Sequence, residues 1–429
     1  MKKIDSTESV CHICNKKIPA IILRDKNQVF IEKKCPEHGK FIAEHIWGDI
    51  EIYRKFARHK AIEATPAQTA VILTYKCNLN CPICLANANK LKFSDFKIKN
   101  LTKAKGSKAV LLTGGEPTVR EDLDRIIAKI KRGGQKVVLL SNGLKLADKK
   151  YALKLKRAGL DWVRLQFDAM DRQDSLHIRG RDLISLKRQA IKNLESLNIK
   201  ITLCTVLIKR NLNKLPRFFN FVFKHPKIRH ISANPLWKIG RYREEDFVSS
   251  REIIEKISTI FNLKKSDWIE STIFLIDLDN FMSLFGKRYR HFCQCNIKCL
   301  LLRDKEEMIP ITKIFNLRKI HLKLTDLQLK KSFFKTIRFF LYLLINQVIL
   351  NFLTNKYFRI FFLRCLANIK TLFQGKSLFS NIFYSVSVEY FMTKENFDLR
   401  VSRACNLDGL SPESLEKRPA CLSRSALMN

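Results

Sequence analysis

The sequence has few glycines and prolines, 14 and 11 in 429 residues, and only half as many acidic residues as basic ones. This scarcity of glycine and proline excludes a collagen-like or low-complexity chain. Because 46% of the residues are hydrophobic, most of the chain is expected to fold around packed cores. The first 30 residues contain no apolar run long enough for a secretory signal, so we expect a cytoplasmic protein.

The shortage of acidic residues leaves 80 lysines and arginines against 40 aspartates and glutamates, a formal net charge of +40. Such a charge suggests an anionic partner, either a nucleic acid or a membrane surface. The basic residues are spread along the chain and do not alternate with aromatics in the pattern of a nucleic-acid-binding fold. A genome that favours lysine codons explains the charge as well, and we expect no nucleic-acid partner.

Six units repeat between Thr69 and Leu236, each a short β-rich apolar run followed by an amphipathic helical stretch. The predicted strands are 70–75, 109–113, 136–140, 162–167, 199–208 and 228–233. This pattern predicts an α/β fold, either a partial (β/α)6 barrel of the TIM type or an open sheet. The first crossover, residues 92–105, is polar and weakly periodic, so we expect it to be short or irregular.

Composition divides the chain into five predicted regions. They are a metal-binding module over 1–65, the barrel over 66–250, a cysteine-bearing segment over 251–330, a basic apolar helical segment over 331–375, and a second cysteine-bearing segment over 376–429. The region beyond the barrel is expected to be rich in α-helix.

The oddest stretch covers 333–373, where Phe, Leu and Ile alternate with Lys and Arg. Its uncharged part, 339–355, contains polar residues and is shorter than a membrane-spanning helix requires. It predicts an interfacial amphipathic helix at the inner face of the membrane or the wall of an apolar cavity. A buried helix pair in a globular domain explains the pattern equally well.

Thirteen cysteines with short spacings suit metal ligands in a reducing compartment better than disulfides. Cys77, Cys81 and Cys84 follow the first predicted strand, at the carboxyl edge where α/β barrels build their sites. Three thiolates with this spacing can bind three irons of a [4Fe-4S] cluster and leave the fourth iron open. The second strand ends in the segment Gly114-Gly115-Glu116-Pro117, whose glycines permit a close backbone approach to a ligand.

The three cysteines and the GGEP segment together resemble the radical S-adenosylmethionine (SAM) superfamily. The resemblance implies that SAM binds the open iron and that one electron cleaves SAM to a 5′-deoxyadenosyl radical. It also implies a reductant protein such as a ferredoxin or flavodoxin. The residues that it places around SAM are Gly114, Gly115, Glu116, Pro117, Asn142, Asp168 and Asn234.

The amino-terminal module carries Cys11, Cys14 and Cys35 in two knuckle-like turns, which is typical of zinc ribbons and rubredoxin-type iron sites. With only three cysteines, we predict His38 as the fourth ligand of a mononuclear Fe or Zn, with His12 as the second choice. An incomplete site is the alternative.

Five further cysteines, Cys293, Cys295, Cys299, Cys405 and Cys421, are candidates for an auxiliary Fe–S cluster or are scattered free thiols. Cys204 and Cys365 lie in apolar segments and are interpreted as packing residues. His177, Arg179 and Arg181 follow the fourth strand, where we interpret them as part of a solvated loop outside the site.

The whole chain resembles a group that includes tetraether lipid synthases and relatives described as pterin methylases. The resemblance rests on the amino-terminal CxxC…CPxHG module, the LTGGEPTVREDL segment, the LQFD strand end, the cysteines of 293–311 and the carboxyl-terminal FD…C…PAC residues. It implies hydrogen abstraction and carbon–carbon bond formation on an archaeal-type isoprenoid lipid at the membrane surface. The alternatives are methylation of a pterin or another small molecule, and a non-catalytic Fe–S or zinc protein that binds nucleic acid.

Overall fold

The computed structural model describes most of the chain, with gaps that lie mainly in its second half. The described residues are 1–58, 65–90, 94–104, 106–237, 240–241, 244–282, 289–290, 295–330, 348, 350–367, 382–390, 395–399, 401, 407–410 and 418–419. Cys293, Cys405, Cys421 and most of the segment 333–373 lie outside these residues, so the predictions made for them stay predictions.

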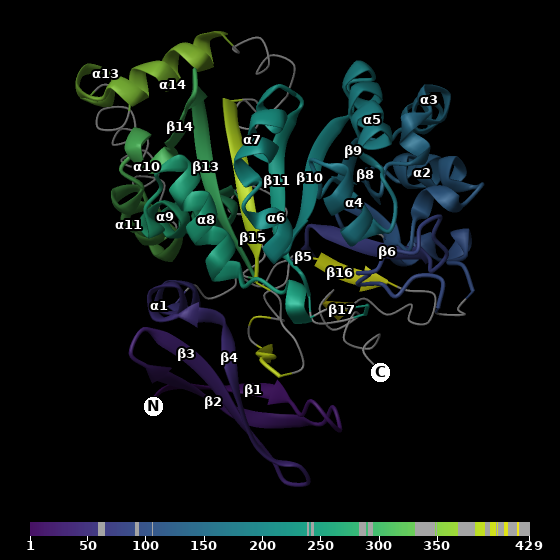
Figure 1. Ribbon diagram of the computed structural model, residues 1–429. Helices are drawn as coiled ribbons and strands as arrows, with labels where there is room; N and C mark the ends of the chain where they lie inside the picture. Colours follow the sequence, from purple (N-terminus) through teal and green to yellow (C-terminus); the bar gives the residue numbers. More distant parts are fainter. Residues whose placement is uncertain are drawn as a thin grey trace.

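The amino-terminal module is a four-stranded antiparallel sheet followed by a short helix, α1 (Ile50–Arg58). Its strands are β1 (Lys2–Val10), β2 (Lys17–Asp25), β3 (Gln28–Cys35) and β4 (Gly39–Asp49). Alternate residues of β2 and β3 point into a core, where Ile22 and Ile31 are fully buried. In Figure 1 this sheet lies beneath the larger body of the protein.

All six predicted core strands are present, and they lie in sequence order in one parallel sheet. They are β6 (Gln68–Thr74), β7 (Ala109–Gly114), β8 (Lys136–Ser141), β9 (Trp162–Gln166), β10 (Lys200–Leu207) and β11 (Ile228–Pro235). Because all six run in one direction, their carboxyl ends share one edge of the sheet, the edge at which α/β proteins place their sites.

Both edges of this sheet are extended by strands from the second half of the chain, which the sequence analysis did not predict (Figure 1). β15 (Phe383–Glu389) pairs in parallel with β11, and β13 (Asn296–Asp304) and β14 (Glu307–Pro310) follow it with antiparallel pairing. At the other edge β16 (Leu407–Leu410) pairs in parallel with β6, and β17 (Arg418–Pro419) pairs with β16. The region expected to be α-rich therefore also contributes strands, two of which flank the core strands directly.

Eight helices surround the core strands, and most of them cover one face of the sheet. They are α2 (Leu123–Arg132), α3 (Lys149–Ala158), α4 (Arg172–Arg179), α5 (Ile184–Ser196), α6 (Lys209–Leu212), α7 (Leu215–Phe223), α8 (Ser250–Phe261) and α9 (Lys265–Met282). On this face alternate strand residues such as Leu165 and Leu203 pack with the helices in one large apolar core. The first crossover contains a 3₁₀ helix, Ile98–Ala104, which confirms the predicted irregularity.

The opposite face of the sheet is concave. Arg164 on β9 lies 3.8 Å from Glu389 on β15, although β10 and β11 separate the two strands. Three strand spacings amount to about 14 Å, and Glu389 lies four residues, about 13 Å, beyond Ser385, the residue in register with Arg164. In a flat sheet the two Cα atoms would thus be about 19 Å apart, more than the two side chains can span, so the sheet curves toward this face. This inner face is the counterpart of the interior of a barrel, and the predicted partial barrel is consistent with it.

The described part of the basic apolar segment forms two helices, α13 (Leu350–Thr354) and α14 (Lys356–Ala367). Phe358 is buried in a small core with α10 (Ile311–Ile314) and α11 (Leu317–Lys330). Leu353 and Leu363 on the other side remain exposed, at 66% and 63%. Within the described residues, no helix is both long and apolar enough to cross a membrane.

Candidate functional site

The loop that carries Cys77, Cys81 and Cys84 begins directly after β6 and is held by Asn89. The Asn89 side chain accepts a hydrogen bond from Cys77 N–H at 2.8 Å and donates to the carbonyls of Cys77 and Leu79, both at 3.1 Å. The Leu79 N–H in turn points at the Cys77 sulfur, at 3.4 Å. The three cysteines belong to one small cluster with Leu79, Leu144 and Leu183.

A second contact fixes the end of this loop. Cys84 pairs with Arg241 through two backbone hydrogen bonds of 3.1 and 3.0 Å, although 157 residues separate the two in sequence. Gly240 precedes this bridge with φ +67°, and a Cβ atom there would lie 2.2 Å from the Cys84 carbonyl oxygen. Only glycine permits this approach, so the segment after β11 closes over the cysteine loop.

The predicted GGEP segment packs against the residues that lead into the cysteine loop. Gly115 N–H donates to the Thr74 carbonyl at 2.8 Å, and Glu116 N–H donates to the Lys76 carbonyl at 2.9 Å. A Cβ atom on Gly115 would lie 2.4 Å from the Lys76 carbonyl oxygen. The glycines therefore allow the ends of β6 and β7 to approach each other closely. This structural role is independent of any ligand that the glycines also contact.

Glu116 is buried and links the ends of β7 and β8. Its carboxylate accepts hydrogen bonds from Thr118 N–H at 3.1 Å, the Thr118 hydroxyl at 2.6 Å, the Ser141 hydroxyl at 2.9 Å and Asn142 N–H at 2.7 Å. Burial raises the pKa of Glu116, and these four hydrogen bonds oppose the rise. Pro117 begins a short 3₁₀ helix that supplies two of these donors.

Asn142, at the end of β8, reaches the cysteine loop. Its amide donates to the Asn78 side chain at 2.8 Å and lies 4.0 Å from the Cys77 sulfur. Glu116, Asn142 and Cys77 thus form one connected set at the carboxyl edge of the sheet. That these residues bind SAM stays a prediction.

Asp168, after β9, is buried with Arg179 and Lys187. The Arg179 guanidinium donates to Asp168 at 2.8 Å and contacts the Cys81 sulfur, and Lys187 lies 3.7 Å from the same carboxylate. Burial alone would raise the pKa of Asp168, but the two cations and the Val206 N–H together lower it. Burial also lowers the pKa of Lys187 to about 8.

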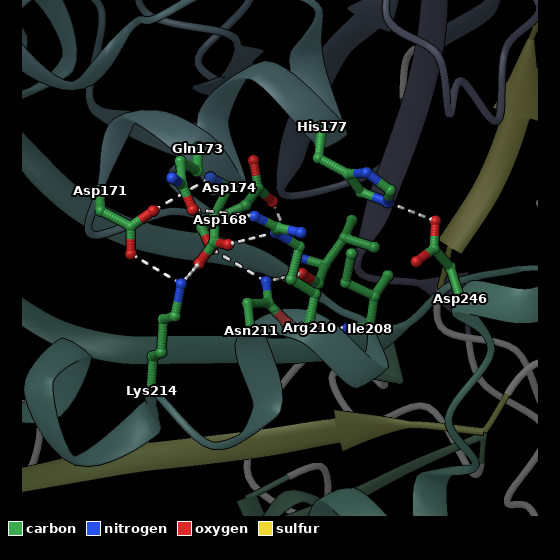
Figure 2. A network of polar contacts seen from close by, with 11 residues as sticks. Asp168, Asp171, Gln173, Asp174, His177, Ile208, Arg210, Asn211, Lys214 and Asp246 are labelled. Carbon is green, nitrogen blue, oxygen red and sulfur yellow. Dashed lines mark hydrogen bonds and ion pairs between the residues drawn. The ribbon is translucent and has the colours of Figure 1, made fainter.

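Two expectations about this region were wrong. Arg179 is not on a solvated loop, because it ends helix α4 with only 5% of its surface exposed. His177 lies on the same helix and contacts Asp246 at 2.7 Å (Figure 2). The sequence signal that was missed is the helix cap: Asp171 accepts from Asp174 N–H at 3.0 Å, and Gly180 ends the helix with a positive φ.

Figure 2 shows that helix α4 is tied by charged side chains to α6 and to Lys214, the residue that precedes α7. Asp174 is fully buried and accepts hydrogen bonds from Arg210 at 2.9 Å and Lys214 at 2.7 Å. The Asn211 amide donates to the Asp168 backbone carbonyl at 3.0 Å. The network thereby fixes the helix that brings Arg179 to Cys81.

The inner face of the sheet has an apolar half and a polar half. Ala70, Leu111, Val138 and their neighbours form an apolar patch on β6 to β8. From β9 onward many inner positions are polar, although Trp162, Val206 and Leu300 on the same face are apolar. Apart from Asn234, the polar positions were not predicted from the sequence. They are Arg164, Gln166, Thr202, Cys204, His230, Ser232, Asn234, Ser385, Ser387, Glu389, Asn296 and Lys298.

These polar residues form cross-strand contacts; Thr202, Ser232 and Ser387 are fully buried, and the others are partly buried. His230 contacts the hydroxyls of Ser385 and Ser387 at 3.0 and 3.3 Å, and the Ser232 hydroxyl donates to Asn234 at 3.0 Å. Cys204, interpreted from the sequence as a packing residue, lies here in contact with the Arg164 guanidinium. Asn234 at the end of β11 therefore belongs to a wider polar surface.

Four side chains of the amino-terminal module converge as the sequence predicted. The Cys11, Cys14 and Cys35 sulfurs and the His38 imidazole nitrogen all lie within 4.8 Å of one another, and this is the one such group of three or more ligands among the described residues. His12, the second choice, packs its ring edge against Phe41 instead. Burial opposes ionisation of Cys11, yet N–H groups of Cys14 and Ile13 lower the pKa of its thiol to about 6. The arrangement is a Cys3His zinc-like site.

Of the predicted auxiliary ligands, only Cys295 and Cys299 are described. Cys299 on β13 is fully buried in the main apolar core, and burial raises the pKa of its thiol. Cys295 is half-buried just before the strand. An auxiliary cluster therefore stays a prediction.

The cysteine loop fits a [4Fe-4S] cluster. Three thiols in an apolar setting, one with an N–H donor and one with an arginine beside the sulfur, are the ligand set of such a cluster with one iron open. Burial raises the pKa of Cys77 to about 11, so a free thiolate is disfavoured there, and bound iron would compensate its charge.

Comparisons with known proteins agree with both sites. Residues 3–47 match the family model described as the HMPTM N-terminal zinc ribbon domain, and residues 71–222 match that of the radical SAM superfamily. The chain is 34% identical over 283 residues to the 7,8-dihydro-6-hydroxymethylpterin dimethyltransferase of Methanocaldococcus jannaschii, which covers 57% of this chain and 56% of that protein.

A probable GTP 3′,8-cyclase of Saccharolobus islandicus is 30% identical over 207 residues, 46% of this chain and 67% of that protein. Among solved structures, Streptococcus suis SuiB bound to precursor peptide SuiA aligns with a TM-score of 0.41 and 18% identity, over 49% of each chain. The chain spans about half the length of the first curated relatives that it matches. With the cysteine loop, the GGEP segment and the parallel sheet in place, the radical SAM family model and the similarity to the cyclase show that the chain belongs to the radical SAM superfamily, whose cofactors are a [4Fe-4S] cluster and SAM.

Proposed function

We propose that the protein is a radical SAM enzyme that modifies a polar heterocycle of the pterin type, by methylation. The observation that carries the proposal is the polar half of the inner face, whose strands β9, β10, β11 and β15 end at the same edge of the sheet as β6, the strand that leads into the cysteine loop. The similarity to a protein named as a pterin dimethyltransferase supports it. The supply of electrons by a protein such as a ferredoxin or flavodoxin belongs to the same proposal.

Bound cluster and SAM would supply a 5′-deoxyadenosyl radical that removes a hydrogen atom from a substrate carbon. The residues of the chain hold the cofactor loop and the substrate in position. Asn89 and the Gly240–Arg241 segment hold the cysteine loop in place. Arg179, positioned by Asp168, places a positive charge beside one ligand sulfur. The curved sheet holds the substrate on its inner face.

The isoprenoid lipid expected from the sequence is less compatible with this face. A long apolar chain would displace water from Arg164 and Glu389, whose 3.8 Å contact is longer than a hydrogen bond, at a cost of roughly 1–3 kcal/mol for each group left without a partner. A flat heterocycle with ring nitrogens and carbonyls would satisfy them. Exposed Leu353 and Leu363 on α13 and α14 favour contact with an apolar surface, but they lie away from the inner face.

The test is product analysis with anaerobically reconstituted protein, SAM, a reductant and 7,8-dihydro-6-hydroxymethylpterin. We expect mass spectrometry to detect a pterin product heavier by one or two methyl groups, with a methyl donor supplied from cell extract. The matched control is Cys77→Ala, which should yield none. No pterin product, together with a product from an archaeal isoprenoid lipid, would overturn the proposal in favour of the lipid reaction.

A further inference from the structure

Arg164 and Glu389 meet on the polar half of the inner face without closing into a hydrogen-bonded ion pair. Arg164 comes from the middle of β9, and Glu389 ends β15 at the carboxyl edge of the sheet. Their charged atoms are 3.8 Å apart, which is longer than a hydrogen bond. The side chains are 26% and 23% exposed. Both groups therefore keep hydrogen-bonding capacity toward a ligand on this face.

A third group faces the same place. Asn296 is the direct partner of Glu389 in the antiparallel β13–β15 register, so both side chains lie on the same face of the sheet. The Asn296 side-chain oxygen is enclosed and has no hydrogen-bond partner within the described part of the chain. An enclosed acceptor without a donor costs free energy unless a ligand or water supplies one.

The three groups define the chemistry of a complementary ligand. A carboxylate accepts two parallel hydrogen bonds from neighbouring N–H groups, and the amide oxygen accepts a further one. The guanidinium donates to a carbonyl oxygen on the same ring. An amino-pyrimidinone ring presents this order along one edge: an amino group, a ring N–H and a carbonyl.

We propose that Glu389, Asn296 and Arg164 bind the amino-pyrimidinone edge of the substrate, and thereby orient the heterocycle on the inner face of the sheet. This proposal rests on the proposed function and identifies the residues that determine which heterocycle the enzyme accepts. Asn234, a predicted SAM contact, lies on the neighbouring strand next to Glu389, so the bound ring lies beside the cofactor region. Pterins and guanine nucleotides both carry this amino-pyrimidinone edge, so a ligand of either kind can bind these residues.

The test is a binding titration that follows quenching of pterin fluorescence on anaerobically reconstituted protein. It compares 6-hydroxymethylpterin with the corresponding lumazine, in which an oxo group replaces the amino group. We expect the wild type to bind the pterin at least about 10-fold more tightly than the lumazine. In Glu389→Gln this preference should disappear, with pterin affinity reduced about 10-fold or more.

The matched control is Glu255→Gln, an exposed glutamate on α8 that should bind the pterin as the wild type does. Iron content and the melting temperature of Glu389→Gln show whether the variant is folded. Arg164→Lys is a second variant, which keeps the positive charge but lacks the planar set of N–H donors of a guanidinium. Displacement by guanosine triphosphate distinguishes the two sources of the ring edge. If both variants keep the wild-type preference while the wild type methylates the pterin, the recognition site is wrong and the proposed function stands. If the wild type binds neither ligand, both proposals fall.

Discussion

At the scale of single residues, the buried pair of Asp168 and Arg179 is the feature that the sequence concealed most fully. The aspartate was predictable because it follows a strand end, whereas the arginine lies eleven residues later among polar residues that look solvated. Only the fold of α4 places its guanidinium against the carboxylate and Cys81. Spacing along the chain identifies ligands that share one loop. It does not identify a residue such as Arg179, which a later helix places against that loop.

Removing one member of this pair should be costly. Arg179→Met leaves Asp168 with Lys187 at 3.7 Å as its remaining cation, and we expect the free energy of unfolding to fall by roughly 3–5 kcal/mol. The double variant with Asp168→Asn should lose less than the sum of the single changes. Urea unfolding of the four proteins measures this. Arg251→Met, which removes an exposed pair with Glu255, is the control and should change nothing measurable; equal losses at both positions would contradict the account.

His230 on the inner face gives the protein a pH dependence. Its burial, with the charges of Lys298 and Arg164 nearby, lowers the pKa of His230 well below its usual value. Below about pH 6.5 the unfolded chain takes up a proton that the folded protein does not, so stability falls as the pH falls, by up to about 1.4 kcal/mol per unit. His230→Gln should remove this part of the slope in denaturant unfolding followed between pH 7 and pH 5. An identical slope in the variant would show that His230 titrates normally.

At the scale of elements, prediction succeeded where the pattern is local. Buried parallel strands read as continuous apolar runs, and all six were recognised within two residues at each end. β15 was missed because its alternating sequence, FYSVSVE, lies far along the chain from its partner β11. The alternation itself indicated one polar face, but no local signal shows which strand it joins.

The Gly240–Arg241 bridge is the element-scale contact most open to test. Gly240→Ala forces a left-handed conformation on alanine, which costs about 1–2 kcal/mol, and drives a methyl group against the Cys84 carbonyl. We expect the variant to retain less iron after reconstitution and to lose it faster to a chelator. Gly133→Ala at the end of α2 has a negative φ and a nearest contact of 3.2 Å, so it serves as the control. Equal iron retention in the two variants would mean that the bridge does not hold the cysteine loop.

At the scale of the whole molecule, the zinc-ribbon module is joined to the main sheet by a segment from near the end of the chain. Asp398 is fully buried, accepts a hydrogen bond from the Thr7 hydroxyl at 2.8 Å and contacts His45 at 3.2 Å. The Ser9 hydroxyl donates to the Phe397 carbonyl at 2.5 Å. The metal site was predictable from the cysteine spacing, but this docking was not, because its residues are nearly 400 positions apart.

Asp398→Ala should loosen this junction. It leaves His45 and Thr7 without their shared acceptor, and we expect a loss of roughly 1–3 kcal/mol. Hydrogen–deuterium exchange should become faster in β1 and β4 and stay unchanged in β9 and β10. Asp25→Ala, at the exposed end of β2, is the control. Faster exchange throughout the main sheet would indicate general unfolding and not undocking.

The central claim is that a radical SAM site works here beside a polar, heterocycle-binding face. Chromatographic measurement of 5′-deoxyadenosine formed from SAM, in anaerobically reconstituted and reduced protein with and without the dihydropterin, tests it most directly. The account predicts 5′-deoxyadenosine in the wild type, more of it when the dihydropterin is present, and none in the variant with Cys77, Cys81 and Cys84 changed to alanine. Formation that persists in the triple variant, or that responds to an isoprenoid lipid and not to the dihydropterin, would contradict it.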